Sequence, residues 1–421
     1  MPRFFIPLII LSIVACCIEI DISVPSFPDM AHYFNVSGDI IQMTIAYNLL
    51  GFGLGALAYG PLSDSYGRRP IMLWGNGILL IGAVGCVIAP SIPFLMATRF
   101  IQGIGAAASA VVAFAMIADV YPEKDKSAAL LGIMNAVFTG IMAFAPLLGG
   151  FINEAFSWRG NYGIVALICL VSWIFLVLTL PETKKTQEPF RLEKISLYYM
   201  QLLTNFPFFC ASMVPSMLYS IYLSFIAQAS FLYTETFQLS VMEYVFHQAV
   251  ILVTFAVVSL LSGRITRKIG SRKSVNLGML ISLIGSIALV GTCITFPISP
   301  NLTTLFMSII CLGSAISYPV IFGASLEIFP EIKGTSSSLI MSMRSLVCFG
   351  TVAATGYCYN GDSLRIALLV LIIFGLSSLF TLFLLKSHVF QGGNIAGANL
   401  SLEQNLRGSY QKTHHQKTLL K

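Results

Sequence analysis

The stretch Gly60-Pro61-Leu62-Ser63-Asp64-Ser65-Tyr66-Gly67-Arg68-Arg69-Pro70 joins two long apolar runs and decides the fold. A weaker copy begins 203 residues later and also joins two apolar runs: Gly263-Arg264-Ile265-Thr266-Arg267-Lys268-Ile269-Gly270-Ser271-Arg272-Lys273. In this copy Arg267 stands at the position of Asp64. A turn rich in glycine and arginine, repeated at matching places in two hydrophobic halves, predicts a duplicated helical bundle in a membrane. That architecture is typical of secondary transporters.

The composition of the chain excludes an ordinary soluble protein. Of its 421 residues, 56% are apolar and only 10% are charged, whereas a soluble domain carries about 25% charged residues. The nine cysteines lie in or at the ends of apolar runs. They have neither the loop placement of a disulfide scaffold nor the paired spacing of a zinc site. We expect them to be small packing residues, and we expect no metal and no cofactor.

Twelve apolar segments of about 20–25 residues can each cross the ~30 Å hydrocarbon core as a helix. They run over 4–24, 40–62, 71–90, 93–117, 128–152, 161–180, 207–231, 241–262, 274–297, 302–326, 335–358 and 364–386. The expected fold is all-α and integral to the membrane, with twelve transmembrane helices in two pseudo-symmetric six-helix bundles. The expected divisions are an N-terminal bundle (1–183), a cytoplasmic linker (184–206), a C-terminal bundle (207–386) and a disordered cytoplasmic tail (387–421).

Lysine and arginine predict the orientation. If the N-terminus is cytoplasmic, twenty of the 24 basic residues fall on the inner side and only Arg159 and Arg365 fall outside. Arg99 and Arg344 lie within the membrane. The net charge of +6 then reflects topology, so no nucleic-acid partner is expected. The prediction is a multi-pass protein of the inner (plasma) membrane with both termini cytoplasmic. A cleavable signal in the first span is the alternative, but it would need a more basic start.

The turn over 60–70 has features that orientation alone does not require. Gly60 and Gly67 permit a tight turn and close helix contact. Asp64 is expected to accept hydrogen bonds from the first amides of the next helix, where an anion is favoured. Arg68 and Arg69 add positive charge at the cytoplasmic boundary. We expect this segment to act as a gating turn, and simple topology signalling by the two arginines is the alternative.

Small residues mark two further spans. Span 93–117 holds Arg99-Phe100-Ile101-Gln102-Gly103-Ile104-Gly105, and span 128–152 holds Gly140 and then Ala145-Pro146-Leu147-Leu148-Gly149-Gly150. Small residues let membrane helices approach closely. The expected helix-packing residues are therefore Gln102, Gly103, Gly105, Gly140, Pro146, Gly149 and Gly150. Arg99 is too costly to face lipid, so it should face the bundle interior and have a partner.

These motifs resemble those of the major facilitator superfamily over roughly residues 5–386. The 60–70 turn is similar to the G-x-L-x-D-x-x-G-R-R loop, although Ser65 stands where many members have a basic residue. The span with Arg99 is similar to R-x-x-Q-G-x-G-x-A, and residues 140–150 resemble the antiporter motif with Ala145 in place of one glycine. The pattern Asp21-x-x-x-Pro25-x-x-Pro28 resembles the twelve-span drug:proton antiporter branch, and most closely its bicyclomycin-resistance (Bcr/CflA-type) subfamily.

The resemblance implies a proton-coupling acid near the outer end of the first span. At 1.5 Å per residue, Asp21 lies ~25 Å from the inner side and Arg99 lies ~9 Å from the outer side. Both therefore fall in the outer third of the core. We expect Asp21 to face the cavity and to pair with Arg99, while Glu19 faces another way. Burial would favour the neutral acid and Arg99 the carboxylate. The alternatives are Glu19 as the proton carrier and Asp21 as a surface cap.

Four residues of the C-terminal half are candidates for a substrate cavity: Tyr222, Gln228, His247 and Arg344. For the first three, hydrogen bonding between helices is the alternative. Arg344 lies ~14 Å into its span, near the midplane. Its expected partner is left open among backbone carbonyls, a substrate group, and Asp21 or Glu19 across the cavity.

Taken together, the motifs predict a proton-coupled exporter of drugs or small amphipathic metabolites that works by alternating access. An importer or exchanger of a metabolite is one alternative, and a transporter-like sensor that moves nothing is another. An enzyme is not expected, because there is neither a G-x-x-x-x-G-K-[ST] loop nor an H-E-x-x-H pair. The expected partners are a small-molecule substrate, protons and the lipid bilayer, and the expected state is a monomer.

Overall fold

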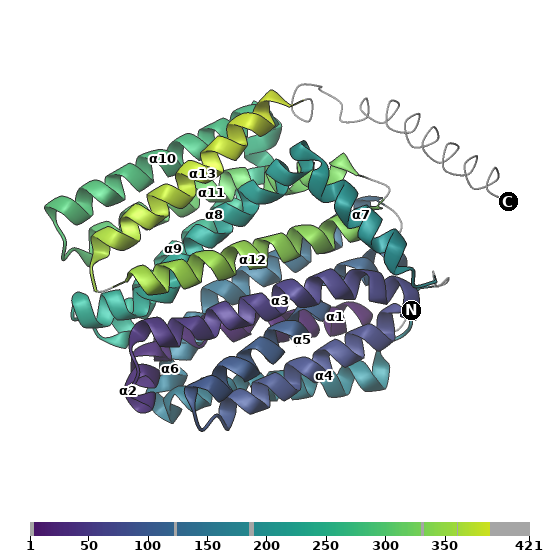
Figure 1. The fold of residues 1–421 in the computed structure, drawn as a ribbon, viewed down its shortest axis with the longest axis horizontal. Helices are drawn as coiled ribbons and strands as arrows, with labels where there is room; N and C mark the ends of the chain where they lie inside the picture. The colour runs from purple at the N-terminus through teal and green to yellow at the C-terminus, as the bar shows by residue number, and fades with distance from the viewer. Residues whose placement is uncertain (1–3, 122–123, 185–188, 330–331, 360, 388–421) are drawn as a thin grey trace, which may run out of the picture.

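The computed structural model describes residues 4–387 apart from 122–123, 185–188, 330–331 and 360. Of the predicted tail, only Ser387 is among them. The first half contains α1 (Phe5–Asp21), a 3-10 turn (Val24–Ser26), α2 (Phe27–Phe34), α3 (Gly38–Tyr66), α4 (Arg68–Val87), α5 (Ile92–Val120) and α6 (Lys124–Thr179). The second half contains α8 (Phe206–Phe231), a π turn (Leu232–Thr236), α9 (Val241–Ile269), α10 (Ser271–Thr295), α11 (Pro300–Ile328), α12 (Lys333–Cys358) and α13 (Ser363–Lys386). Figure 1 shows the halves side by side.

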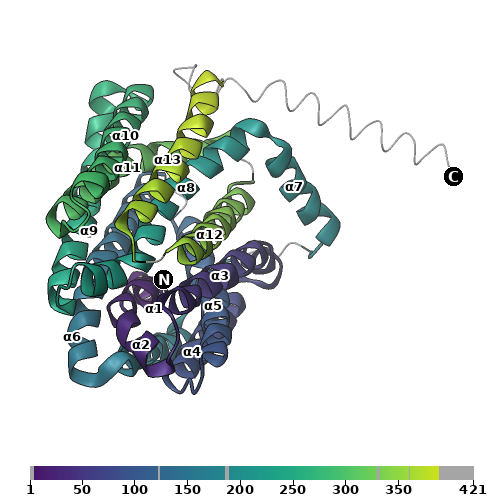
Figure 2. The same ribbon diagram turned by 60° about the vertical axis from the view of Figure 1, so that its left-hand side comes forward.

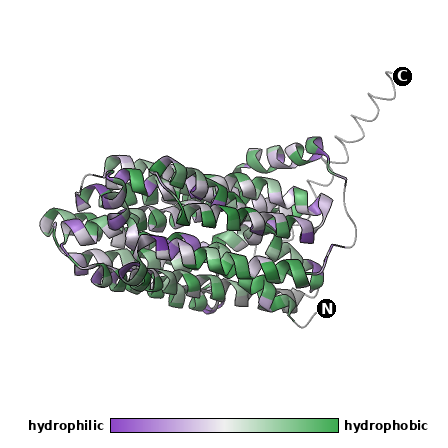
Figure 3. Ribbon diagram, turned by 90° about the horizontal axis from the view of Figure 1, so that it is seen from below, coloured by the Kyte–Doolittle hydropathy of each residue, from purple (hydrophilic) through white to green (hydrophobic). Residues whose placement is uncertain are grey.

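The expected twelve-helix membrane fold is confirmed. Within the described residues, eleven helical segments are long and apolar enough to cross a membrane. One of them, α6, is interrupted at Ser157, whose φ of 65° breaks the helix into two crossings. Apolar residues cover most of the length of the helices in Figure 3, and the polar residues gather toward the ends.

The backbone records the duplication more clearly than the sequence does. Among the described residues, positive φ occurs in three pairs, each separated by 203 or 204 positions: Asn35 with Gln238, Gly67 with Gly270, and Ser157 with Gly361. Each of these residues lies at a junction between two helical segments, and the two junctions of a pair have corresponding places in the two halves. Gly67 and Gly270 have nearly the same backbone angles, with φ of 99° and 84° and ψ of 156° and 155°. A left-handed residue directly between two helices is therefore required in both copies, and glycine adopts it without steric cost.

Helix α5 packs closely between α3 and α4, because the two glycines of its motif lie on opposite faces. A Cβ atom at Gly103 would clash with the carbonyl oxygen of Asn48 on α3, and one at Gly105 would clash with the backbone of Leu79 on α4. Residues two apart on a helix are about 200° apart around its axis. The R-x-x-Q-G-x-G spacing therefore serves two neighbours at once.

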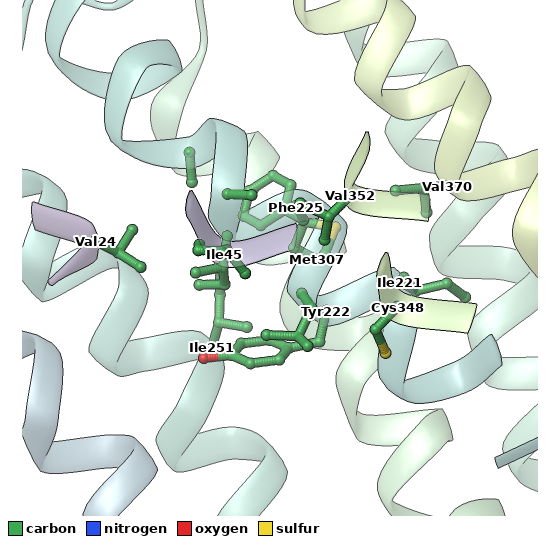
Figure 4. Packing of buried hydrophobic residues seen from close by; sticks show 14 of the residues in the cluster. Val24, Ile45, Ile221, Tyr222, Phe225, Ile251, Met307, Cys348, Val352 and Val370 are labelled. Carbon is green, nitrogen blue, oxygen red and sulfur yellow. The ribbon is translucent and has the colours of Figure 1, made fainter. Parts of the chain in front are cut away.

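The two halves meet along two helix pairs, α3 with α12 and α6 with α9. Figure 2, turned by 60° from Figure 1, also shows α3 beside α12. A core cluster crosses this boundary, and Figure 4 shows part of it, including Val24 and Ile45 from the first half and Tyr222 and Phe225 from α8. Contact between halves is thus mainly apolar, so the hydrogen bonds that cross it are specific features.

The linker contains a helix that the sequence analysis did not expect. Helix α7 (Leu192–Thr204) buries Leu202 and leaves Leu197 and Met200 exposed. Its Tyr199 hydroxyl donates to the carbonyl oxygen of Leu57 on α3 at 2.7 Å. Burial, with a smaller contribution from the charge of Asp64, raises the pKa of Tyr199 above its usual range. The hydroxyl therefore keeps its proton and attaches the linker to α3.

One expected packing residue is wrong. Gly140 is exposed, and a Cβ atom there would meet nothing within 4 Å. The other glycines of that motif do lie in contacts: a Cβ at Gly149 would clash with the carbonyl oxygen of Ile22, and one at Gly150 would lie 3.0 Å from Val245 on α9. Pro146 lies inside α6 in the same segment. The motif therefore packs only through its last turn.

These contacts predict opposite outcomes for two glycine-to-alanine variants. Gly103→Ala should destabilise the protein by about 1–3 kcal/mol, the usual cost of overpacking, because the new methyl group meets backbone. Gly140→Ala should leave stability unchanged or raise it slightly, since alanine favours helix. Thermal unfolding of both purified variants in detergent tests this. Equal melting temperatures for the two variants would contradict it.

Candidate functional site

The first span changes from α-helix to a short 3-10 turn just after its two acids. Helix α1 stops at Asp21, a 3-10 turn begins at Val24 with Pro25 in its first turn, and α2 begins at Phe27 with Pro28 in its first turn. Proline lacks a backbone N–H and is tolerated at such starts. The two acids therefore lie in the last turn of α1, directly before a segment in which two prolines interrupt the regular helical hydrogen bonds.

The buried ion pair of this region joins Glu19 and Arg99, and the expected Asp21–Arg99 pair is wrong. Arg99 Nη1 lies 3.4 Å from Glu19 Oε2 and 2.8 Å from Gln102 Oε1. Asn48 Nδ2 donates to the same Glu19 carboxylate oxygen at 3.1 Å. Depth placed both acids near Arg99, but two residues on a helix are about 200° apart in direction. In this helix the side chain of Glu19 points toward α5.

This pair belongs to the interior of the first half. The side chains of Glu19 and Arg99 are only 1% and 0% exposed, and the Arg99 guanidinium lies 5.8 Å from the centre of the Tyr162 ring on α6. Its Nε and Nη2 atoms have no hydrogen-bond partner among the described residues. The pair connects α1, α3, α5 and α6 around one charge, so it stabilises the arrangement of the first bundle.

Asp21 instead faces the second half. Its Oδ1 accepts a hydrogen bond of 2.9 Å from the Tyr222 hydroxyl on α8, and the residue is 3% exposed. A second hydrogen bond between the halves, from Gln42 Nε2 to Gln228 Oε1, measures 2.6 Å. At Gly38 a Cβ atom would touch the ring of Phe231. We call this end, which also holds α2, the outer end. The halves are thus in direct contact there.

A small cavity lies between α8, α9, α11 and the α6 helix of the other half. Its walls include Tyr219, Tyr222, Phe255, Ser314 and Tyr318, and Met142 closes it from α6. It measures about 20 Å³, which is room for about one water molecule. A drug-sized molecule needs several hundred Å³. Substrate can enter this space only if α6 moves away from the second half.

Arg344 borders the same cavity through two of its tyrosines. It donates to the Tyr318 hydroxyl at 3.1 Å, and its guanidinium carbon lies 4.9 Å from the centre of the Tyr219 ring. Of the partners left open by the sequence, neither acid is present: within the described part of the chain, Arg344 forms no ion pair with a carboxylate.

Of the four expected cavity residues, Tyr222 lines the cavity and Arg344 borders it, whereas His247 and Gln228 do not line it. His247 Nδ1 lies 2.9 Å from Thr304 Oγ1, and its ring packs on Tyr233. Gln228 is engaged with Gln42. Both therefore take the helix-to-helix bonding that was the alternative reading.

The 60–70 turn lies in an ionic network at the opposite, inner end. Asp64 Oδ1 lies 2.9 Å from Arg68 Nη2 and 2.6 Å from Lys184 Nζ of the linker. Arg68 Nε also lies 3.0 Å from Asp119 at the end of α5. The network therefore fastens the linker to α3, α4 and α5.

Asp64 does not cap the next helix, and that expectation is wrong. The carboxylate of Glu182 accepts from the amides of Arg68 and Arg69 at 3.0 and 3.1 Å. Asp64 precedes Gly67 by three residues on the end of α3, and it reaches the Arg68 side chain instead. The sequence analysis missed Glu182, Lys184 and Asp119. The charged segment Pro181-Glu182-Thr183-Lys184 directly after a span was the available signal.

The turn also touches the second half. A Cβ atom at Gly60 would clash with Ser338 Oγ on α12. A polar cavity of about 320 Å³ lies beside it, lined by Asp64, Arg68, Arg191 and the start of α12 at Gly334 and Thr335. In the second copy of the turn, Arg267 is exposed and forms no ion pair with another described residue, so within the described chain this ionic network belongs to the first copy alone.

Known proteins share this arrangement. Residues 9–352 match the Major Facilitator Superfamily. A bicyclomycin resistance protein homolog from Haemophilus influenzae is 27% identical over 349 residues, covering 78% of this chain and 82% of that protein. The chloramphenicol resistance protein CraA of Acinetobacter baumannii is 24% identical over 343 residues, covering 81% and 82%.

Solved structures are similar in fold. The human organic anion transporter MFSD10 (TETRAN) superposes with a TM-score of 0.70 at 17% identity, covering 91% of this chain and 100% of that one. The xylose transporter XylE of Escherichia coli, in a partially occluded inward-open conformation, gives a TM-score of 0.71 at 15% identity, covering 93% and 99%. With its two six-helix halves, its 60–70 turn and this match over most of its length, the chain belongs to the Major Facilitator Superfamily.

Proposed function

We propose that this protein is a proton-coupled exporter of small amphipathic molecules that works by alternating access. The observation that carries the proposal is Asp21, a buried acid whose hydrogen bond to Tyr222 joins one half to the other. Similarity to proteins named for bicyclomycin and chloramphenicol resistance supports export. One chain supplies both sides of the pathway, which supports a monomer as the working unit.

The proposed coupling follows from the surroundings of Asp21. Arg99 is paired with Glu19, and Asp21 has a tyrosine as its partner and no cation among the described residues. A carboxylate held without a counter-ion in a membrane protein is costly unless water reaches it. Contact between the halves at the outer end therefore favours protonated Asp21, and separation of the halves lets water support the carboxylate. A proton gained on one side and lost on the other would then drive the cycle.

We also propose that the protein lies in the inner (plasma) membrane with both termini cytoplasmic. The basic residues support this orientation. Arg68, Arg69 and Lys184 lie together at the inner end. Arg159, one of the two expected outside, packs on Tyr33 and Trp158 near α2 at the other end.

Cysteine labelling tests the orientation. Ser271 and Asn301 are both exposed and lie at the starts of α10 and α11, and the native cysteines are buried or half-buried. A membrane-impermeant thiol reagent on intact cells should label Asn301→Cys and spare Ser271→Cys. After lysis both should react, and the unmodified protein is the background control. Labelling of Ser271→Cys alone in intact cells would reverse the proposed orientation.

The inner ionic network predicts a transport defect that is not a folding defect. Asp64→Asn should lower the melting temperature only modestly, because the Asp64 side chain is 33% exposed and the buried Arg68 keeps Asp119 as a second carboxylate partner. Transport should fall by roughly fivefold or more, since the network couples the linker to three helices. The matched control is Arg267→Asn, at the same position of the second copy. Equal transport by both variants would remove Asp64 from the mechanism.

The coupling proposal is tested by Asp21→Asn in proteoliposomes. This variant keeps a neutral polar side chain at the interface, so it should still exchange a substrate such as chloramphenicol across the membrane without a gradient. Transport driven by an imposed pH gradient should be lost. Tyr222→Phe should retain gradient-driven transport at a reduced rate, because it keeps the acid and removes only the hydrogen bond that joins the halves.

Glu19→Gln separates the two acids. It leaves Arg99 buried without its counter-ion, so a loss of stability of about 3–5 kcal/mol is expected. The protein that does fold should keep its response to the pH gradient. If gradient-driven transport instead persists in Asp21→Asn and disappears in Glu19→Gln, then Glu19 is the proton carrier. If an imposed gradient drives no transport in the unmodified protein, the exporter proposal itself fails.

A further inference from the structure

We infer that the cavity beside Arg344 selects organic anions with an aromatic ring over cations of the same shape. This inference deepens the proposed function, on which it rests, by naming a class of substrate. It is drawn from three features of the second half: an arginine with no acidic partner, a wall of aromatic rings, and a buried hydroxyl with no partner of its own.

The first feature is the charge of Arg344. Its guanidinium contacts Tyr318 through a hydrogen bond and Tyr219 through the ring face, and both residues line the cavity. Neutral tyrosines orient the group but do not neutralise it. An arginine within a membrane bundle is normally paired. The nearby acids of α1 are engaged elsewhere, Glu19 with Arg99 and Asp21 with Tyr222. An anion in the cavity would supply the missing partner.

The second feature is the shape of the surroundings. The rings of Tyr219, Tyr222, Phe255 and Tyr318 come from three helices, α8, α9 and α11, and all line the same space. Aromatic walls pack well against a flat ring. Arginine adds a planar fork that matches a carboxylate with two parallel hydrogen bonds. The combination fits a ring that carries a carboxylate or a similar planar anion.

The third feature is Ser314. It lines the cavity, its residue is 5% exposed, and its hydroxyl has no hydrogen-bond partner among the described residues. Buried hydroxyl groups normally have one. The hydroxyl can donate to an oxygen of a bound anion, so that Ser314 and Arg344 would hold it from α11 and α12.

The same cavity disfavours cations. A bound ammonium group would meet the positive charge of Arg344, and no carboxylate is among the residues that line the cavity. Asp21, which accepts from the wall residue Tyr222, belongs to the first half. Specificity arises from such repulsion as well as from attraction. The cavity is nearly closed here, with Met142 of α6 against it. Binding therefore requires the first half to withdraw, and the charge that the ligand meets on entry is that of the second half.

The test uses three probes with one ring system: 2-naphthoate (anion), 2-naphthamide (neutral) and 2-naphthylmethylammonium (cation). Their affinities for the full-length protein in detergent are measured by equilibrium dialysis. The unmodified protein should bind naphthoate about 10- to 100-fold more tightly than the ammonium, the range expected for hydrogen bonds to charged groups. Arg344→Met should abolish that preference and leave naphthamide binding within about threefold.

Two further variants separate binding from structure. Arg344→Lys keeps the charge without the planar fork, so part of the preference for naphthoate should return. Arg365→Met removes an exposed arginine that donates to the Cys358 carbonyl oxygen, away from the cavity lining, and should keep the full preference. If Arg344→Met weakens all three probes alike, Arg344 has a structural role and the inference is wrong. Failure of the unmodified protein to bind naphthoate, or tighter binding of the ammonium, also overturns it.

The outcome is distinguishable from failure of the proposed function. In proteoliposomes, gradient-driven transport of naphthamide by Arg344→Met would leave the exporter proposal standing whichever probe binds best. Conversely, selective naphthoate binding by an unmodified protein that transports no probe under a gradient would keep the anion site and reject the exporter.

Discussion

A bilayer offers no water to an ionised side chain, and the interior of this bundle is organised by that constraint. One charge is neutralised locally: Arg99 is surrounded by Glu19, Gln102 and the ring of Tyr162, all within the first half. Asp21 and Arg344 differ from Arg99, because the hydrogen-bond partner of each is a neutral tyrosine hydroxyl. A tyrosine satisfies a hydrogen bond and leaves the charge uncompensated. These two sites therefore remain open to protonation, to water or to a ligand, whereas the Glu19–Arg99 pair does not.

The two ends of the molecule are held together by different kinds of contact. At the outer end the halves meet through buried contacts, with hydrogen bonds such as Gln42 to Gln228. At the inner end Asp64, Arg68 and Lys184 form a partly exposed ionic network. Its carboxylates, Asp64 and Asp119, are 33% and 27% exposed, so water can reach them and the inner network breaks at lower cost than the fully buried Glu19–Arg99 pair. The inner network holds the linker, and through Tyr199 the linker also holds α3. The inner end is thus suited to repeated opening.

Much of the fold could be predicted from the sequence, because the length of the apolar runs fixes the membrane spans. The close packing of Gly103 and Gly105 is predicted correctly because these glycines act through backbone contact with the neighbouring helices. The predictions fail where a partner comes from a distant helix. Depth places Glu19 and Asp21 together, and only the rotation of α1 decides which one meets Arg99. Glu182 caps α4 although it lies 114 residues further along the chain. Rules based on the spacing of nearby residues do not predict such a contact. The prediction for Gly140 fails because a glycine motif does not show which of its positions packs against another helix.

The two halves share their backbone geometry but differ in their charged residues. Left-handed residues recur at intervals of 203 or 204, and so do the single-glycine turns Gly67 and Gly270. The charges do not recur. Arg267 stands at the position that corresponds to Asp64. Arg99 of the first half is paired with Glu19, whereas Arg344, on a helix that does not correspond to α5, has no carboxylate partner among the described residues. The backbones of the two halves are alike at their turns. Because their charges differ, one half can carry the proton site while the other presents a fixed positive charge to the cavity. An alternating cycle needs both properties: equivalent scaffolds allow the two end states to be close in energy, and unequal chemistry lets a proton and a substrate bias them in opposite directions.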